Sequence, residues 1–497
     1  MKYYLGVDIG TYESKGVLVD GAGEIVASAA RPHKMLVPQP GWAEHDAEQD
    51  WWGDFKFITL KLIADSKIDP KLIRAVGASA IGPCMLPVDI AGRPLMNGVL
   101  YGVDTRAADE IKDLTAEHGE ATLLAETGNA LTSQSVGPKI KWLRGKHPEL
   151  YAKAHKFITS TTFIVQRLTG RYVIDHYSAG SWSPLYLPSE GEWSGRFASG
   201  ICDLDKLAEV MWTTQIAGHV TSDAARETGL AVGTPVIAGT IDAAAEAVSV
   251  GVLAPGQMML MYGSTIFIIL VTEQRGQDAR LWYAPWLFPD QHASMSGLST
   301  SGTLTHWFRN EFAHEFMDIK AGAIALAQEA AASPAGAKGL LVLPYFSGER
   351  TPIHDPDAKG MIFGLNLTHK RGDVYRALLE GIGHGTRHIM ETYANAGQKV
   401  AEIEAVGGGT KNAVWLQATS DIGGFVQSIR AKTVGASYGD AFLAALGIGD
   451  VVATDINNWN PPSRQAKPDA TLKVLYGRQH GIFRALYDRN KDLMKLA

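Results

Sequence analysis

The chain has 497 residues, of which 46% are hydrophobic and 20% are charged, and its formal net charge is −6. This length is enough for two large domains, and the lack of a dominant basic run argues against sequence-independent nucleic-acid binding, which needs clustered Lys and Arg. Only two cysteines occur, which suits a reducing compartment. No apolar signal segment precedes the first predicted strand, and the longest apolar run, residues 258–271, is too short and too polar to span a membrane. We therefore expect a cytoplasmic protein without a membrane partner.

The predicted elements begin with a strand, a polar turn and a second strand. Residues 3–7 and 16–19 are apolar and fit the two strands. The turn between them holds an acid, a glycine, a hydroxyl and a lysine, which are Asp8, Gly10, Thr11 and Lys15. The glycine lets the backbone turn sharply and lets phosphate approach its N–H, whereas the acid would repel phosphate unless a magnesium ion lay between them. A β-hairpin with a polar turn is the alternative on this stretch alone.

The first half continues with predicted strands at residues 76–79 and 236–239 and a mainly helical region at residues 110–168. Asp242 follows the second of these strands and opens a helix of small residues, 243–250. A carboxylate in this position can take the proton from an attacking hydroxyl. An N-cap of the helix is the alternative, and both roles can hold together.

The start of the second half repeats the order of the first strands. Residues 258–262 and 266–271 are strand-like, and Gly263-Ser264-Thr265 forms the turn between them. An internal duplication would place two similar domains face to face, each offering one phosphate-holding hairpin to a cleft. Pro255-Gly256 breaks the chain just before the repeat. We expect the two domains to be residues 1–253 and residues 254–497.

A glycine-rich turn follows the predicted strand 404–406 and precedes a helix that starts near residue 414. Such a turn lets a flat or charged ligand contact the backbone, the helix N-terminus can face phosphate, and Asn412 can bond a purine or a ribose. A tight strand–helix turn without a ligand is the alternative. The candidate nucleotide-binding positions of this turn are Gly407, Gly408, Gly409 and Asn412.

Two further patterns indicate packing rather than ligand binding. A Walker A loop is absent, and the glycines of residues 381–385 lie within a long predicted helix, 370–392, where they indicate close helix packing. Trp42, Trp51 and Trp52 are likewise interpreted as packing residues rather than as a binding platform.

The ordered set of motifs resembles the FGGY carbohydrate kinases, the family that contains xylulokinase, glycerol kinase and ribulokinase. The resemblance covers nearly the whole chain, and the order of the motifs carries it more than any one of them. The matching segments are Asp8-Ile9-Gly10-Thr11 with Lys15, Gly41-Trp42-Ala43-Glu44, residues 138–143, residues 239–242, Tyr262-Gly263-Ser264-Thr265, Gly348-Glu349-Arg350-Thr351-Pro352, residues 360–365, and Gly407-Gly408-Gly409 to Asn412.

The resemblance implies an α/β fold of two actin-like, ribonuclease H-like domains facing a central cleft. It implies transfer of the ATP γ-phosphoryl group to a hydroxyl of a ketose or sugar alcohol, with the N-terminal domain binding the sugar and the C-terminal domain binding the nucleotide. By this carry-over Asp242 is the general base, and Asp8 is the metal-binding residue that supports Mg²⁺–ATP. ATP and its phosphates would be held by Asp8, Gly10, Thr11, Lys15, Gly263, Ser264, Gly302, Gly407, Gly408, Gly409 and Asn412.

The acceptor side departs from the family pattern. Gly82-Pro83 stand where xylulokinases carry Met-His, Gly102 stands where many members carry Trp, and Ala243 stands where Asn or Gln is common. Smaller side chains would make room, and fewer hydrogen-bond partners relax the penalty against analogues that lack a hydroxyl, so we expect an acceptor of roughly four to six carbons with D-xylulose as a poor or secondary substrate. The candidate acceptor-binding residues are Gly82, Pro83, Asp104, Gln134 and Asp242. For Asp104, a local ion pair with Arg106 is the alternative.

Two classes of protein stay open. The first is a sugar or polyol kinase, and the second is a non-catalytic actin-like protein that binds nucleotide without transferring phosphate. Retention of both Asp8 and Asp242 favours the first, because a pure binder needs no base facing an acceptor. A kinase of glycerol or another short polyol and a nucleotide hydrolase are further options within the enzyme class. The expected partner is a small-molecule sugar or polyol, and a homodimer is an open option.

Overall fold

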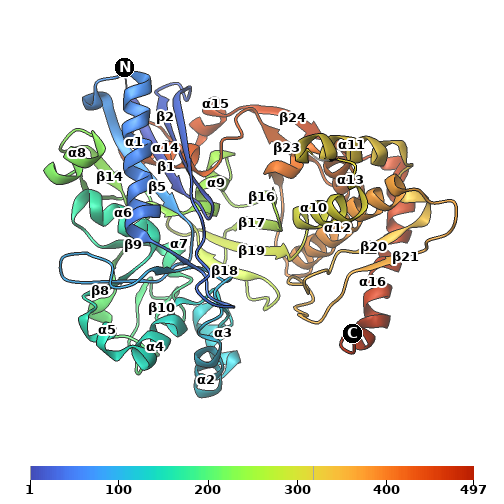
Figure 1. The fold of residues 1–497 in the computed structure, drawn as a ribbon, viewed down its shortest axis with the longest axis horizontal. Helices are drawn as coiled ribbons and strands as arrows, with labels where there is room; N and C mark the ends of the chain where they lie inside the picture. Colours follow the sequence, from blue (N-terminus) through green and yellow to red (C-terminus); the bar gives the residue numbers. More distant parts are fainter. Residues whose placement is uncertain (1, 317) are drawn as a thin grey trace.

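The computed structural model describes residues 2–316 and 318–497, and two seven-stranded sheets dominate this part of the chain (Figure 1). The strands of the first sheet are β1 (Tyr3–Ile9), β2 (Glu13–Asp20), β3 (Ile25–Pro32), β5 (Ile73–Ala80), β13 (Ile216–His219), β14 (Pro235–Ile237) and β15 (Thr240–Ile241). The strands of the second sheet are β16 (Gln257–Tyr262), β17 (Ile266–Thr272), β18 (Trp282–Pro285), β19 (His292–Leu298), β22 (Glu402–Val406), β23 (Gln427–Arg430) and β24 (Pro462–Ala466).

The two sheets share one strand order. In the first sheet β1 pairs antiparallel with β2 and parallel with β5. In the second sheet β16 pairs antiparallel with β17 and parallel with β22. The order β3-β2-β1-β5-β14 therefore corresponds to β19-β17-β16-β22-β23. The two predicted strand–turn–strand units are confirmed, and each supplies the central hairpin of its sheet.

Helices cover both faces of each sheet. α1 (Gly53–Ser66) and α6 (Ser160–Thr169) pack on the outer face of the first sheet, and α12 (Arg371–Asn395) and α13 (Ala413–Gly423) pack on the outer face of the second. Between the sheets lie α9 (Asp242–Ser249) and α14 (Ala436–Gly447), and their apolar side chains form one core with residues of both sheets. The two lobes therefore share a middle layer of two helices (Figure 1).

The middle layer depends on glycines. A Cβ at Gly6 of β1 would overlap the backbone oxygen of Ser437 in α14, and a Cβ at Gly77 of β5 would overlap that of Asp440. Gly439 of α14 approaches the backbone of α9 in the same way, against the oxygen of Ala245. Glycine at these three positions lets the backbone of α14 contact the backbones of β1, β5 and α9 directly, and no larger residue fits there.

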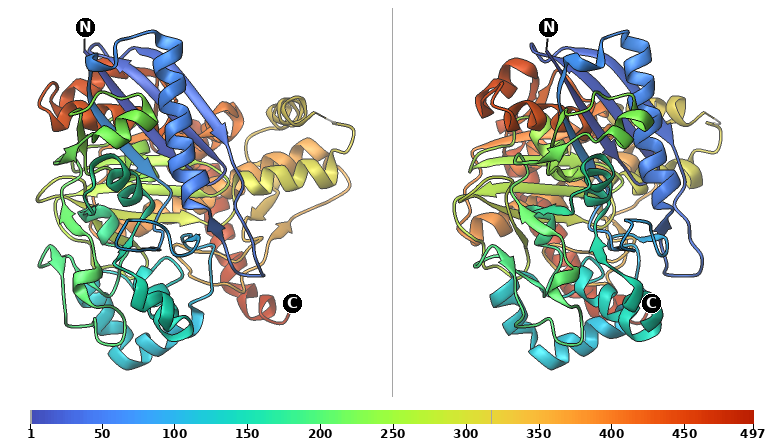
Figure 2. Two further views of the ribbon diagram at one scale, coloured as in Figure 1. Left: turned by 60° about the vertical axis from the view of Figure 1, so that its left-hand side comes forward. Right: turned by 90° about the vertical axis from the view of Figure 1, so that its left-hand side faces the viewer.

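Further helices and short strands build onto this frame. α2 (Ala108–His118), α3 (Glu120–Thr127), α4 (Val136–Lys146) and α5 (Pro148–Lys153) form a helical lobe at the lower end of the first half (Figure 1 and Figure 2). With α6 and the short strand β8 (Lys156–Ile158), they account for the mainly helical region predicted for residues 110–168. The second half adds α10 (Gly302–Phe312), α11 (Ile319–Ala332) and the C-terminal helix α16 (Lys473–Met494).

The long predicted helix of the second half is confirmed as α12, and so is the packing role of its glycines. A Cβ at Gly383 would lie 2.9 Å from the Ile422 Cδ1 atom, and a Cβ at Gly385 would lie 2.9 Å from the Leu298 Cδ1 atom. Gly381 contacts the backbone of Val342. These glycines therefore let α12 approach its neighbours and do not line a phosphate site.

Within residues 2–316 and 318–497, no helix combines the length and the apolar character that crossing a membrane requires.

The glycine contacts of α14 generate a stability prediction. Gly6→Ala should lower the free energy of unfolding by about 1–3 kcal/mol, because the added methyl group forces β1 and α14 apart. Urea unfolding followed by circular dichroism measures this change. Gly21→Ala is the matched control, because no atom lies within 4 Å of a Cβ at that position, and it should shift stability by less than about 0.5 kcal/mol. Equal stability of the two variants would contradict the packing role of Gly6.

Candidate active site

Asp8 and Asp242 meet because three neighbouring strands run in the same direction. Ser79 of β5 lies opposite Asp8 of β1 on one side and opposite Thr240 of β15 on the other, and both pairings are parallel. The carboxyl ends of the strands therefore reach the same sheet edge, where Asp242 opens α9. Ligands bind at this edge of α/β sheets in general.

Burial dominates the electrostatics of the two carboxyl groups. One carboxylate oxygen of Asp8, Oδ1, is buried and has no hydrogen-bond partner among the described residues. Burial and the neighbouring charges of Asp242 and Asp440 raise the pKa of Asp8 well above its usual range. Burial also raises the pKa of Asp242 to about 7, although its Oδ1 atom accepts a 2.7 Å hydrogen bond from the Ala243 backbone N–H. A carboxyl group titrating near neutral pH is suited to proton transfer.

Two further acids, Asp440 and Glu246, lie near Asp8 and Asp242, and sequence reasoning missed both. We call these four residues the acidic floor. Asp440 of α14 accepts a 2.7 Å hydrogen bond from the Ser79 hydroxyl, and burial raises its pKa well above the usual range. Glu246 lies one helical turn after Asp242 on α9, and burial raises its pKa, while Lys15 opposes the shift. The four-residue spacing of Asp242 and Glu246 was the signal that could have found the second acid, because residues four apart share one helix face.

The first predicted phosphate turn is held from behind by two imidazoles. The Nε2 atom of His33 lies 3.0 Å from the Gly10 carbonyl oxygen, and that of His45 lies 3.1 Å from the Thr11 carbonyl oxygen. A Cβ at Gly10 would lie only 2.6 Å from the Glu13 carbonyl oxygen, so the tight turn requires glycine. Lys15 is half-exposed, and its Nζ atom lies 3.2 Å from the Glu13 carboxylate.

The second predicted phosphate turn lines a cavity of about 880 Å³, which we call the nucleotide cavity. Gly302 at the start of α10 packs onto this turn, and its backbone N–H donates a 3.0 Å hydrogen bond to the Gly263 carbonyl oxygen. The sequence-predicted residues that line the nucleotide cavity are Gly263, Ser264, Gly302, Gly408, Gly409 and Asn412.

Gly407 supports the nucleotide cavity without lining it. Its φ is +90°, and a Cβ there would lie 2.6 Å from the Tyr262 carbonyl oxygen, so the end of β22 requires glycine. Asn412 caps α13, where its side-chain oxygen accepts a 3.2 Å hydrogen bond from the Trp415 backbone N–H. Its amide nitrogen has no hydrogen-bond partner among the described residues in this arrangement.

The rest of the nucleotide cavity combines apolar walls with cationic side chains. Ile324, Leu326 and Trp415 contribute apolar surface, and Arg309 and Lys411 contribute positive charge. This chemistry fits a flat base together with a polyphosphate.

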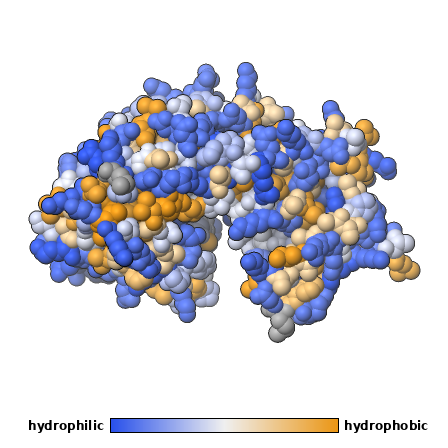
Figure 3. Space-filling model, turned by 90° about the horizontal axis from the view of Figure 1, so that it is seen from above, coloured by the Kyte–Doolittle hydropathy of each residue, from blue (hydrophilic) through white to orange (hydrophobic). Residues whose placement is uncertain are grey.

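A second cavity of about 260 Å³, which we call the acceptor cavity, contains Asp242. Sequence-predicted Gly82, Pro83 and Gln134 line it. Its other walls carry hydroxyl and amide groups and aromatic rings, from residues that include Asn129, Thr132, Ser181, Ser183, Tyr177, Phe267 and Trp282. Thr265 lines this cavity, whereas Gly263 and Ser264 line the nucleotide cavity, so the second turn lies between the two cavities. Figure 3 shows the surface hollowed between the two lobes.

The expectation that small residues make room for the acceptor is wrong at two positions. A Cβ at Gly82 would lie 2.8 Å from Ile241 Cγ1, so the side chain of Ile241 already occupies this space. A Cβ at Gly102 would lie 2.7 Å from the Gln134 amide nitrogen, and the Gly102 backbone N–H donates a 3.1 Å hydrogen bond to Gln134 Oε1. Gln134 therefore fills the place beside Gly102, and neither glycine adds space for the acceptor.

Asp104 does not line the acceptor cavity. Its carboxylate accepts a 2.7 Å hydrogen bond from the Ala43 backbone N–H and forms a 2.7 Å ion pair with Arg106, which also contacts Glu44 at 2.8 Å. The Arg106 guanidinium lies 3.8 Å from the centre of the Trp42 ring. These contacts favour the ion-pair interpretation of Asp104, and they explain the Gly-Trp-x-Glu segment as a structural unit.

Two residues that line or support the acceptor cavity had no role assigned from the sequence. Arg350 of the Gly-Glu-Arg-Thr-Pro segment lines the cavity, with its guanidinium 6.0 Å from the centre of the Trp282 ring. Lys139 is buried, and its Nζ atom donates hydrogen bonds to the carbonyl oxygens of Leu100 (2.6 Å) and Tyr101 (3.2 Å). Tyr101 lines the cavity, so Lys139 positions it from behind.

Across the described ranges, no three or more His, Cys, Asp and Glu side chains form a group that would hold a metal ion by themselves. The buried Oδ1 atoms of Asp8 and Asp440 both lack a hydrogen-bond partner within the described part of the chain and fit a cation, since Mg²⁺ usually takes one or two carboxylates together with water and substrate phosphates.

Comparisons with known proteins agree with this geometry. The profile of the FGGY family of carbohydrate kinases, N-terminal domain, matches residues 3–249, and that of the C-terminal domain matches residues 258–448. The xylulose kinase of Bacillus subtilis (strain 168) is 28% identical over 500 residues, covering 99% of this chain and 98% of that protein. The ribulokinase of Geobacillus thermodenitrificans (strain NG80-2) is 28% identical over 487 residues, covering 90% and 86%. The crystal structure of xylulose kinase from Rhodospirillum rubrum has a TM-score of 0.93 and 29% identity, covering 99% of this chain and 100% of that one.

Two sheets that share one strand order, each with a glycine–hydroxyl turn in its central hairpin, define the actin-like, ribonuclease H-like class. Within that class, the chain belongs to the FGGY family of carbohydrate kinases. The resemblance stated from the motifs is confirmed, and so is the α/β fold. The protein is an ATP-dependent phosphotransferase with an alcohol group as acceptor.

Proposed function

We propose that this kinase transfers the γ-phosphoryl group of ATP to a hydroxyl of a ketose or sugar alcohol, with ATP in the nucleotide cavity and the sugar in the acceptor cavity. The observation that carries the proposal is the position of the Gly263–Thr265 turn, which lines both cavities, beside the acidic floor. Such an arrangement acts mainly by positioning the two substrates and by stabilising charge.

Asp242 is the general base in this proposal. It lines the acceptor cavity, and its pKa of about 7 leaves a large fraction ionised near neutral pH. The ionised carboxylate accepts the proton of the attacking hydroxyl as the phosphoryl group is transferred. The backbone N–H of Ala243 orients it through the 2.7 Å hydrogen bond to Oδ1.

Asp8 is the residue that would hold Mg²⁺ in this proposal. The ion would neutralise phosphate charge next to the acidic floor. Asp8 supports this role through its buried oxygen without a partner and through its place beside Asp242.

The remaining predicted residues divide between the two glycine turns and the adenosine side. In this proposal Gly10, Thr11 and Lys15 act on phosphate from the first turn, and Gly263 and Ser264 act from the second. Gly302, Gly407, Gly408, Gly409 and Asn412 shape the nucleotide side. We further propose the division into residues 1–253 and 254–497, with the acceptor cavity completed by side chains of the second part.

The acceptor is proposed to be a ketose or sugar alcohol of roughly four to six carbons. Gln134, Asn129 and Thr132 supply amide and hydroxyl groups for an acceptor of this chemistry. Pro83 has no side-chain donor, and Ala243 has neither donor nor acceptor, so a ligand hydroxyl at those positions would find no partner. The similar proteins named xylulose kinase and ribulokinase support a ketopentose-sized acceptor without deciding between the two.

A cytoplasmic location is also proposed, because Cys84 and Cys202 are both buried free thiols and suit a reducing compartment. A homodimer stays an expectation from the sequence. The alternative of a non-catalytic nucleotide-binding protein gains no support from the site, since such a protein needs no acid with a raised pKa in a separate acceptor cavity.

A substrate panel tests the function itself. ADP release should rise above the acceptor-free rate with at least one compound among ketopentoses, ketohexoses, tetritols, pentitols and glycerol. The value of kcat/KM for D-xylulose should be at least tenfold below that of the best compound, which is about 1.4 kcal/mol in transition-state binding. ADP release that no acceptor stimulates would favour the nucleotide-binding alternative. A kcat/KM that is highest for D-xylulose would contradict the argument from Pro83 and Ala243.

The base assignment predicts a kinetic and a pH effect. Asp242→Asn should lower kcat by roughly 10²–10⁴-fold and leave ADP affinity nearly unchanged. In the parent enzyme, kcat should fall as pH drops below about 7, because protonation of Asp242 removes the base, and the residual rate of the variant should lack this limb. Asp109→Asn, on an exposed carboxylate, is the control. A variant that keeps near-native turnover would take Asp242 out of this role.

The metal assignment predicts a change in the magnesium titration. Asp8→Asn should reduce turnover and raise the Mg²⁺ concentration for half-maximal rate by about tenfold or more, because the carboxylate charge that attracts the cation is lost while the side-chain shape is kept. The rate is measured against free Mg²⁺ at saturating ATP. Superimposable titrations of the variant and the parent would show that Asp8 does not act through the metal.

A further inference from the structure

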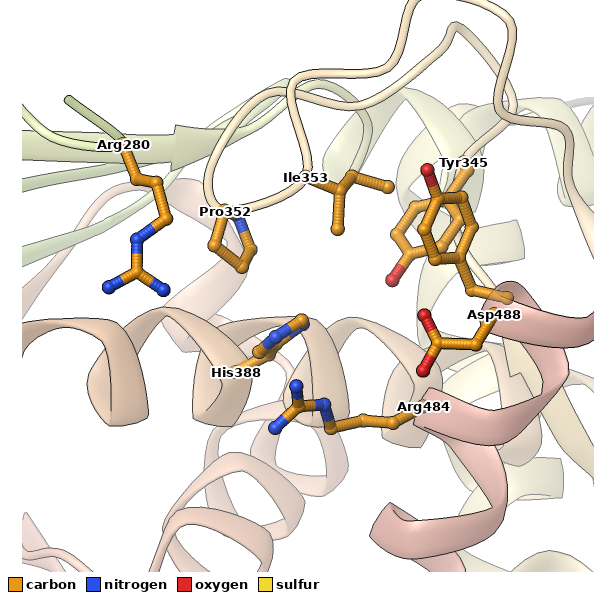
Figure 4. A pocket seen from close by; sticks show the side chains of 8 residues that line it. Arg280, Tyr345, Pro352, Ile353, His388, Arg484 and Asp488 are labelled. Carbon is orange, nitrogen blue, oxygen red and sulfur yellow. The ribbon is translucent and has the colours of Figure 1, made fainter. Parts of the chain in front are cut away.

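A separate pocket of about 210 Å³ lies in the second half, behind the loop of residues 344–360 that joins β20 (Leu341–Leu343) to β21 (Met361–Phe363) (Figure 4). Its lining comes from the segment before β18, this loop, α12 and α16, and none of it lines the nucleotide or acceptor cavity. The residues that the argument uses are Arg280, Tyr345, Pro352, His388, Arg484 and Asp488.

Two guanidinium groups, those of Arg280 and Arg484, line this pocket. Arg280 is held by the Asp278 carboxylate at 2.6 Å. Among the described residues, Arg484 has one ion pair, a longer contact of 3.4 Å to Glu391, and this carboxylate also binds Arg387 at 3.1 Å and His480 at 3.2 Å. Because Glu391 serves three cationic or potentially cationic partners, it compensates little of the Arg484 charge.

His388 lies beside the two guanidinium groups (Figure 4). Burial, then the charge of Arg484 and other neighbours including Arg280, lower the pKa of His388 to about 4, so the imidazole is neutral at physiological pH. A neutral imidazole still carries one N–H donor. This end of the pocket therefore offers Arg280, Arg484 and His388 as donors.

The other end of the pocket has the opposite character. Figure 4 shows the Asp488 carboxylate next to Tyr345, away from Arg280. Asp488 takes part in no ion pair within the part of the chain that the structure describes, so its oxygens can accept hydrogen bonds from hydroxyl groups. A ligand that suits both ends carries an oxyanion at one end and hydroxyls at the other.

We propose that this pocket binds a small phosphate-type oxyanion between Arg280 and Arg484, either inorganic phosphate or the phosphate group of a small hydroxylated metabolite. The planar guanidinium group matches the oxygens of phosphate with paired N–H donors. Inorganic phosphate would use the arginine end alone, whereas a phosphorylated polyol would also place hydroxyls at Asp488.

The loop connects this oxyanion pocket to the acceptor cavity. The Thr351 hydroxyl donates a 3.2 Å hydrogen bond to the Arg280 carbonyl oxygen, and the His354 Nε2 atom lies 3.0 Å from the same oxygen. Pro352 forms the pocket wall between these residues, and Arg350, two residues earlier, lines the acceptor cavity. An oxyanion bound at Arg280 therefore restrains the segment that carries Arg350, which couples the pocket to acceptor binding.

Isothermal titration calorimetry in saturating ADP tests the site, with inorganic phosphate and glycerol 3-phosphate as separate probes. Binding should weaken at least tenfold in Arg484→Gln and stay unchanged in Arg489→Gln, a control on an exposed arginine of the same helix outside the pocket. Equal affinity for both probes assigns the site to free phosphate, and tenfold tighter binding of glycerol 3-phosphate assigns it to a phosphorylated metabolite. Absence of binding, or binding that is the same in Arg484→Gln, would overturn the proposal.

The coupling has its own readout, which rests on the proposed kinase function. Saturating the pocket should change KM for the best acceptor at least twofold and leave kcat unchanged, and Arg484→Gln should abolish the change. An unchanged KM in a protein that binds the probe would refute the coupling. The calorimetry uses no acceptor, so a failure of the site and a failure of the proposed function are distinguishable.

Discussion

The structure depends on the close approach of one helix backbone to two strand backbones. At Gly6 and Gly77 only glycine fits between α14 and the strands β1 and β5, and Gly439 gives the same closeness between α14 and α9. This packing brings Asp440 to the Ser79 hydroxyl and fixes α9, with Asp242 as its first residue, at the strand ends. The acidic floor is therefore set by backbone packing, before any ligand binds.

The acidic floor lowers the free energy of unfolding near neutral pH. The pKa of Asp242 rises from its ordinary value of 3.8 to about 7 in the fold, so the folded protein holds this proton more tightly than the unfolded chain does. Below pH 3.8 the Asp242 carboxyl group is protonated in both states and does not affect stability. As pH rises from 3.8 to about 7, the free energy of unfolding falls. Asp8, Asp440 and Glu246 act with the same sign, because their pKa values are also raised. A site poised for proton transfer is thus maintained at the expense of stability.

Local patterns in the sequence predicted the framework and the backbone turns of the site. The alternation of apolar strands and glycine–hydroxyl turns identified both hairpins, and the glycine run after β22 identified one wall of the nucleotide cavity. Gly6 and Asp440 could not be found in this way, because their roles arise from contacts between segments far apart in the chain. The meaning of Gly102 was also hidden, since the Gln134 side chain that occupies its space lies 32 residues further on.

The middle layer has a consequence for how the chain is held together. α14 belongs to the second half of the sequence, yet it covers β1 and β5 of the first sheet and packs on α9, and the same apolar core reaches strands of the second sheet. Removing residues 436–447 would leave the inner face of the first sheet uncovered. The two lobes therefore share one hydrophobic core, and a break between residues 253 and 254 would divide the sequence without dividing that core.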